Sequence, residues 1–332
     1  MRGNIYYILH CNCYNSYSFN MNRGIIMRSN TMSGIMIMLA ASLTFSLMNA
    51  CVKLLDSLSP MELIFFRHAI TAICIGVWWI FYPPYKTKDS KVRKKGGFSR
   101  LFMRSITGGL AMLAMFYNIA TISLGTASAF AQTMPIYIVL FTLIFTKDRV
   151  RLPTIFATIL GFIGVVCICD IHTQSLGIDN IIAGVLNGIM MALAYMSLKD
   201  LKEYFAESSI IMVFALTMVV VGGILMFIDI PYLSGFAMPN EREWVGIMAL
   251  GILGTLGQML LTRAFMLAPA GLISPLDYMR IVWGVILGIM LGDAIPSVMN
   301  LTGIALIIIS GILIAMPIFL QDYKKYKNAL KE

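Results

Sequence analysis

Charged side chains are scarce in this sequence, since Asp, Glu, Lys and Arg together make up only 12% of its 332 residues. Soluble domains carry about twice that fraction. Hydrophobic residues reach 59%, and the mean hydropathy is +0.82. They occur in runs of about 20 residues, the length that crosses a hydrocarbon core of ~30 Å. The scarcity of charge excludes a soluble protein and predicts an all-α membrane protein.

Several catalytic motifs are also absent. The sequence has no HExxH, no GxSxG and no paired acids with a nucleophile at useful spacing, which argues against an intramembrane enzyme. It has no GxxxxGK[ST] P-loop, so the chain is not expected to hydrolyse ATP by itself. We therefore expect no enzymatic activity and no cofactor.

Metal-site and nucleic-acid motifs are missing as well. Cys11 and Cys13, like Cys167 and Cys169, form close pairs without His or Cys partners at zinc-site spacing, so no metal is expected. The net charge of +9 is concentrated in a few loops and no RNA- or DNA-reading motif appears, so no nucleic-acid partner is expected.

The apolar runs divide the chain into ten expected transmembrane helices. Residues 1–31 lack the apolar core of a signal peptide, and we expect them to be a disordered cytoplasmic segment or a mis-assigned start. A polar connector at 170–180 joins two groups of five spans, and residues 321–332 form a basic cytoplasmic tail. The expected spans are 33–55, 61–82, 101–122, 126–146, 152–170, 181–199, 210–229, 244–266, 272–291 and 299–319.

Basic residues mark the loops of one side. With the N-terminus inside, Lys and Arg gather in the 86–100 loop, after spans four and six, and in the tail. The opposite loops carry almost none. The positive-inside rule therefore predicts that the chain lies in the cell (inner) membrane with both termini on the cytoplasmic side.

The two groups of spans have the pattern of an inverted repeat. Residues 133–148 align with 278–293 at an offset of 145, and in both groups the fourth span ends in Asp before a short loop. Because five spans are an odd number, the second copy must lie inverted in the membrane. Inverted repeats are typical of secondary transporters, whose substrate site lies near the midplane. The expected repeats are residues 32–173 and 178–320.

A family resemblance supports this interpretation. ELIFFR (62–67), SPLDYMRIVWGVILGIMLGDAIP (274–296) and LTGIALIIISG (301–311) resemble the EamA branch of the drug/metabolite transporter (DMT) superfamily over residues 32–320. One departure is that Asp148 and Asp293 stand where the family usually has Glu. The resemblance implies ten helices and secondary transport of small metabolites, without identifying the metabolite.

Asp277 and Arg280 are the most unusual charges, because they stand inside an expected span. Their i, i+3 spacing allows an ion pair, which either lines a cavity or only fixes packing. The same face continues as a small-residue run that predicts close helix packing. The residues of this run are Gly284, Gly288 and Gly292.

Other polar residues in the spans are further candidates for a cavity. Arg67 lies in span two, where it either pairs with Glu62 or Asp56 or lines the cavity. Single polar groups in apolar runs either join helices or share a wet cavity, because lipid offers no hydrogen bonds. These groups are Asn49, Tyr117, Asn118, Gln132, Tyr195 and Gln258. Pro135 and Pro275 interrupt the fourth spans of both halves.

The function expected from these features is alternating-access transport of a small solute. The interior charges are mostly positive, which favours amino-acid-like or other anionic or zwitterionic solutes. A carrier of S-adenosylmethionine or purine-type metabolites or drugs, an intramembrane enzyme and a non-transporting scaffold remain as alternatives. The expected partners are the solute, membrane lipid and a coupled proton, in a monomer or a homodimer.

Overall fold

The structure is a computed structural model that describes residues 31–52, 54–55, 57–84, 97–122, 124–145, 150–168, 177–228, 230, 233–290 and 297–329. These residues are almost entirely helical and contain no β-strand. The segment expected to be disordered, 1–31, lies outside the described residues apart from position 31, and so does most of the basic 86–100 loop.

Most helices begin and end within a few residues of the bounds expected from the sequence. Among the described residues, seven helices are long and apolar enough to cross a membrane, and the segments Ala129–Phe145 and Leu152–Cys167 are shorter apolar helices. The first helix is Thr31–Val52. It is followed by α2 (Pro60–Phe81), α3 (Gly97–Thr121), α4 (Leu124–Ala131), α5 (Met134–Phe145), α6 (Leu152–Ile168), α7 (Ile178–Leu201), α8 (Glu207–Leu225), α9 (Glu241–Leu267), α10 (Ala270–Ile273), the 3₁₀ helix η2 (Ser274–Tyr278), α11 (Met279–Met290) and α12 (Val298–Ala329).

Local sequence explains where several helices begin. Ser59 and Glu62 form a capping box at the start of α2, with Pro60 at the first helical position. Asn240 and Glu243 form a second capping box at the start of α9. Glu62 also accepts a hydrogen bond from the backbone N–H of Ala237 at 2.8 Å. The carboxylate of Glu62 is therefore occupied by backbone donors, and the structure shows no ion pair between Glu62 and Arg67, one of the alternatives that the sequence left open.

Both fourth spans are interrupted close to their prolines. The first stops at Ala131 and resumes at Met134, directly before Pro135. The second changes to a 3₁₀ helix at Ser274, directly before Pro275. Proline removes one backbone donor and clashes with the preceding turn, which accounts for a break at both places. The charged residues expected on one α-helix thus lie on two elements, with Asp277 in η2 and Arg280 in α11.

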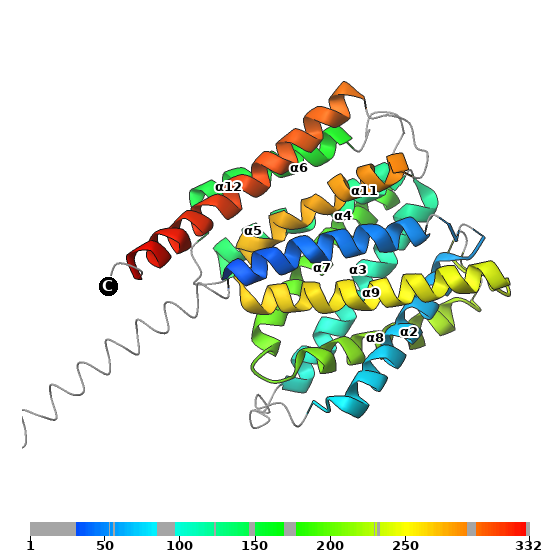
Figure 1. Cartoon of the computed structure of the whole chain (residues 1–332). Coiled ribbons are helices and arrows are strands. Elements are labelled where there is room, and N and C mark those ends of the chain that lie inside the picture. Colours follow the sequence, from blue (N-terminus) through cyan, green and yellow to red (C-terminus); the bar gives the residue numbers. More distant parts are fainter. Residues whose placement is uncertain are drawn as a thin grey trace, which may run out of the picture.

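The helices pack as a bundle in which α3 lies against α7, α6 against α12, and α2 against both α8 and α9. Figure 1 shows α6 and α12 side by side along one edge, while α2 and α8 lie at the opposite edge. The interrupted spans meet each other, because α5 contacts both α10 and η2. The main apolar core includes the buried residues Met38, Phe45, Leu198 and Phe265.

The last helices extend and correct the expectations from sequence. Residues 321–329, in the expected basic tail, continue α12 beyond Pro317. Close packing at Gly284 is wrong, because a Cβ atom built there meets no described atom within 4 Å and the residue is exposed. Gly288 is half-buried, and Gly292 lies outside the described residues. Close glycine-mediated packing occurs instead between α6 and α12, where a Cβ on Gly164 would lie 2.6 Å from the carbonyl oxygen of Gly303.

Candidate functional site

The ion pair expected from the sequence forms at the second interruption. A terminal nitrogen of Arg280, Nη2, donates to Oδ1 of Asp277 at 2.7 Å. Asp277 is 3% exposed, and the Arg280 side chain is 21% exposed. Breaking a buried pair leaves an uncompensated charge, which typically costs about 3–5 kcal/mol. The two charges therefore stabilise each other in a largely buried site, with the arginine more exposed than the carboxylate.

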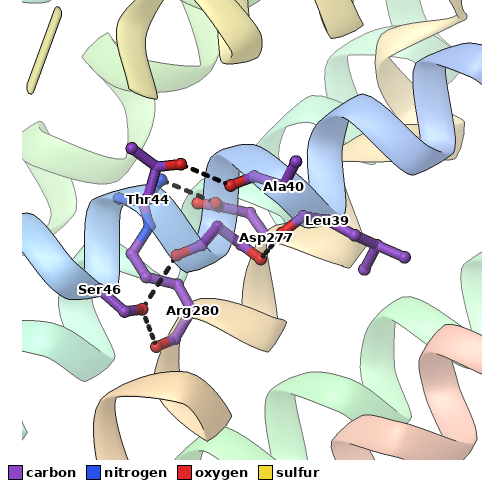
Figure 2. A network of polar contacts seen from close by, with 7 residues as sticks. Leu39, Ala40, Thr44, Ser46, Asp277 and Arg280 are labelled. Carbon is purple, nitrogen blue, oxygen red and sulfur yellow. Dashed lines mark hydrogen bonds and ion pairs between the residues drawn. The ribbon is translucent and has the colours of Figure 1, made fainter. Parts of the chain in front are cut away.

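The first helix holds this pair in place. Ser46 donates its hydroxyl hydrogen bond both to the carbonyl oxygen of Ser42 at 2.9 Å and to that of Arg280 at 2.7 Å. Figure 2 shows the pair against the Thr31–Val52 helix, whose Ser46 points toward Arg280. The Arg280 guanidinium lies over the Phe45 ring, with Cζ 4.4 Å from the ring centroid. Phe45 of the first helix thus adds a cation–π attraction to the hydrogen bond from Ser46.

A second arginine approaches the same phenyl ring. Cζ of Arg67 lies 5.8 Å from the Phe45 centroid. The backbone of α9 makes room for both groups, since a Cβ on Gly254 would lie 2.9 Å from Nε of Arg67 and one on Gly257 would lie 3.2 Å from the Phe45 ring. Glycine at these two positions therefore lets Arg67 and Phe45 lie directly on the helix backbone.

A third arginine, Arg104, completes the cluster from α3. Its Cζ lies 5.5 Å from the ring centroid of Tyr195 and 5.0 Å from that of Phe214. Arg104 is 3% exposed, and its Nε and Nη1 have no hydrogen-bond partner among the described residues. A buried guanidinium without an anion is costly, so this group is available to an anionic ligand.

Tyr195 on α7 lies among these charges. Its hydroxyl is within electrostatic range of Arg67, Arg104, Arg280 and Asp277. Three guanidinium groups, one carboxylate and one tyrosine hydroxyl thus share a site inside the bundle, with two positive charges in excess. Such a site can bind an anionic group and hydrogen-bond a polar one.

Comparisons with known proteins identify the family. The EamA-like transporter family matches residues 32–169. An "Uncharacterized transporter" of Helicobacter pylori is 43% identical over 301 residues, which cover 90% of this chain and 100% of that protein. The chain belongs to the EamA-like transporter family. It therefore also belongs to the drug/metabolite transporter superfamily, and its helices are those of a multi-pass membrane protein.

More distant relatives of this EamA-like transporter carry substrate names. The "Pseudopaline exporter CntI" of Pseudomonas aeruginosa is 28% identical over 280 residues, covering 84% of this chain and 94% of that protein. The "S-adenosylmethionine uptake transporter" of Rickettsia conorii is 23% identical over 257 residues, covering 76% and 81%. A solved crystal structure with 16% sequence identity superposes with a TM-score of 0.73 over 87% of this chain and 98% of that chain, which shows the shared fold alone.

Two other candidate residues of this EamA-like transporter join helices, and a third bonds within its own helix. The Tyr117 hydroxyl donates to Oδ2 of Asp179 at 2.6 Å. Asn118, which is buried, donates to the carbonyl oxygen of Asn180 at 3.1 Å. Both contacts tie α3 to the first turn of α7, as the helix-joining interpretation predicts. Gln258 is buried in α9 and donates to Thr262 within the same helix at 3.4 Å.

The remaining two candidates differ in burial. Gln132 is 5% exposed at the interruption between α4 and α5, and its Oε1 has no partner among the described residues. Asn49 is exposed near the end of the first helix, and no described contact joins it to the arginine cluster. His68 is buried, and its Nδ1 lies 2.8 Å from the carbonyl oxygen of Ile64, which is the arrangement of a satisfied interior histidine.

Sequence reasoning missed Arg104, although it lies inside the expected 101–122 span. An arginine one turn past the start of a span normally extends its guanidinium back to the interface. Only the packing of α3 against α7 and α8 places Arg104 between two aromatic rings. The glycines of α9 beneath Arg67 were missed for the same reason, since their role depends on a neighbouring helix.

Proposed function

We propose that this EamA-like transporter moves a small anionic or zwitterionic solute, of amino-acid-like size and chemistry, across the inner membrane by alternating access. The observation that supports this most is the charge cluster around Tyr195. It draws Phe45, Arg67 and Arg104 from the first half of the chain and Tyr195, Asp277 and Arg280 from the second. A site shared between halves is accessible from either side when the halves rock against each other.

The pattern of helix contacts supports two inverted repeats of five helices, residues 32–173 and 178–320. In such an arrangement the second helices of the repeats, α2 and α8, pack together, as do the fifth helices, α6 and α12. The contact of α2 with α9 likewise has its counterpart in the contact of α3 with α8. A two-fold axis in the membrane plane would exchange the two helices of the first two pairs and would exchange the α2–α9 contact with the α3–α8 contact.

The position of the chain ends supports the proposed orientation. In Figure 1 the start of the Thr31–Val52 helix and the described end of α12 lie at the same end of the bundle. Arg100, near the start of α3, donates to the hydroxyl of Tyr204. Lys202, directly after α7, donates to the carbonyl oxygen of Met266. Because the sequence places its basic loops with the termini, we place both ends of the chain in the cytoplasm.

The names of relatives provide a second candidate class. Relatives named for S-adenosylmethionine uptake and for riboflavin transport share 21–23% identity with this chain, so a nucleoside-like solute is the alternative. Asp277, as the carboxylate of the cluster, is the candidate group for a coupled proton.

Transport by the purified protein in liposomes tests the proposal. The panel consists of amino acids, dicarboxylates, S-adenosylmethionine and riboflavin, preceded by thermal-shift screening in detergent. Saturable uptake of an anionic or zwitterionic solute supports the proposal, and uptake of only S-adenosylmethionine or riboflavin supports the alternative class. A protein that transports no member of the panel would contradict the function itself.

A further inference from the structure

The three arginines of the cluster differ in how their charge is compensated. Arg280 has the carboxylate of Asp277 at 2.7 Å. Arg67 lies over Phe45 against the backbone of α9, with 2.9 Å from its Nε to a Cβ built on Gly254. Arg104 has aromatic rings on its sides, and no carboxylate pairs with it in the described part of the chain. Two of its guanidinium nitrogens, Nε and Nη1, are buried without a hydrogen-bond partner among the described residues, against Nε alone in Arg280.

The surroundings of Arg104 resemble a prepared binding site for a planar anion. The helix geometry places it about 10 Å from the start of α3, because a residue adds ~1.5 Å. Tyr195 and Phe214 hold the guanidinium between two rings, with Cζ 5.5 Å and 5.0 Å from their centroids. Ring contacts of this kind fix the guanidinium but leave its N–H donors unpaired. A fixed guanidinium with unpaired donors is complementary to a carboxylate, which it binds through two parallel hydrogen bonds.

The neighbouring Gly108 makes room for the Arg104 side chain. A Cβ on Gly108 would lie 2.9 Å from Cε2 of Phe214 and would also meet Nη1 of Arg104. Glycine at that position therefore allows the arginine, the phenyl ring and the α3 backbone to lie together. The arrangement positions one side chain among three helices, α3, α7 and α8.

We propose that Arg104 is the anion anchor of the transport site and binds a carboxylate group of the solute. This inference rests on the proposed function and names its substrate class: a solute with at least one carboxylate, whose other polar groups face Tyr195 and the Asp277–Arg280 pair. Arg280 is not the anchor, because its guanidinium already forms an ion pair with Asp277. An anionic group of the solute on Arg104 supplies the counter-charge that no residue in the described part of the chain provides.

The wild-type protein gives the first test, without any substitution. Carboxylate probes and amides of matched shape that carry no carboxylate are compared by thermal shift: leucine with leucinamide, phenylalanine with phenylalaninamide, and succinate with succinamide. The proposal expects the carboxylate of a pair to raise the midpoint of unfolding several degrees more than its amide does. Equal stabilisation by both members of every pair, or none by either, would overturn the anchor role.

Variants of Arg104 give the second test. Arg104→Gln removes the charge, and Arg104→Lys keeps it without the guanidinium fork. Arg100→Gln on the same helix is the matched control, since Arg100 is exposed and contacts Tyr204 instead. We expect Arg104→Gln to lower the affinity for a transported carboxylate at least 10-fold, Arg104→Lys to restore part of it, and Arg100→Gln to leave it unchanged.

Ligand-free stability separates an anchor from a packing group. An uncompensated buried charge destabilises the folded protein, so Arg104→Met is expected to raise the midpoint of thermal unfolding without solute. A lower midpoint, or failure of the variant to fold, means that Arg104 serves packing and contradicts the proposal. Wild-type transport of a solute without any anionic group, or unchanged carboxylate transport by Arg104→Gln, overturns the anchor role while transport itself stands. Absence of all transport by wild type instead contradicts the proposed function.

Discussion

The two interrupted spans of the molecule occupy corresponding places and differ in charge. The α4–α5 interruption precedes Pro135 and holds Gln132, a neutral side chain whose Oε1 has no partner among the described residues. The η2 interruption contains Pro275 and holds the Asp277–Arg280 pair. Proline accounts for the break in both spans, whereas only the second interruption holds an ion pair. The two spans therefore share their backbone geometry, and we assign the contacts with the solute to the second span.

The largest effect is expected from removing one charge at the second interruption. Asp277→Asn keeps the side-chain shape and leaves Arg280 without its carboxylate, a loss of about 3 kcal/mol of folding stability. Thermal unfolding of the detergent-purified variant measures this. A midpoint within one degree of wild type would show that water already compensates Arg280 and that the pair contributes no stability.

A smaller effect is expected where packing supports the second interruption. Tyr278 of η2 is fully buried, and a Cβ on Gly161 of α6 would lie 2.5 Å from its Cδ2. Gly161→Ala overpacks this contact and is expected to cost about 1–3 kcal/mol. Gly284→Ala is the matched control, because a Cβ there meets no described atom within 4 Å. Equal midpoints for the two variants would contradict the tight contact between α6 and η2.

A change beneath Arg67 is expected to alter transport more than stability. The Cβ added by Gly254→Ala lies 2.9 Å from Nε and 3.2 Å from Cγ of Arg67. All of these contacts are with one long side chain that can rotate away, so we expect a small change of midpoint and a raised KM for the solute. An unchanged KM would remove Arg67 from the solute site. Gly223→Ala on α8 is a suitable control, since its nearest contacts are at 3.4 Å.

The smallest effect is expected at the first interruption. Gln132→Leu replaces a buried amide whose oxygen lacks a partner among the described residues with an apolar side chain of similar size. Burying an unpaired polar group is unfavourable, so the variant is expected to match or exceed wild-type stability within about 1 kcal/mol. A loss as large as that of Asp277→Asn would show that the first interruption also depends on a polar contact.

Most of the fold could be predicted from the sequence, because lipid leaves helices as the available solution for long apolar runs. The breaks near Pro135 and Pro275 and the pairing of Asp277 with Arg280 could also be predicted, since they depend on neighbours in sequence. Spacing alone could not predict which helix each face meets. Gly284 was expected to pack closely and lies in open space, whereas Gly254 received no role and supports Arg67.

The candidate site was predictable in part for the same reason. Tyr195 and Arg280 were found as polar groups in apolar runs and lie in the charge cluster. Tyr117 and Asn118 gave the same sequence signal but join α3 to α7. Arg104 gave a weaker signal, since its position near a span end is typical of an interfacial arginine. Tertiary packing, which the sequence pattern does not contain, decides between these outcomes.

The most direct test of the charge cluster is transport by the double variant Asp277→Asn with Arg280→Gln. Removing both charges leaves neither unpaired, so the variant is expected to be more stable than either single variant and monodisperse on gel filtration. We predict that in liposomes this folded protein loses at least nine-tenths of the solute uptake of wild type. Near-wild-type uptake by the folded double variant would show that the pair serves only packing and would contradict the proposed solute site.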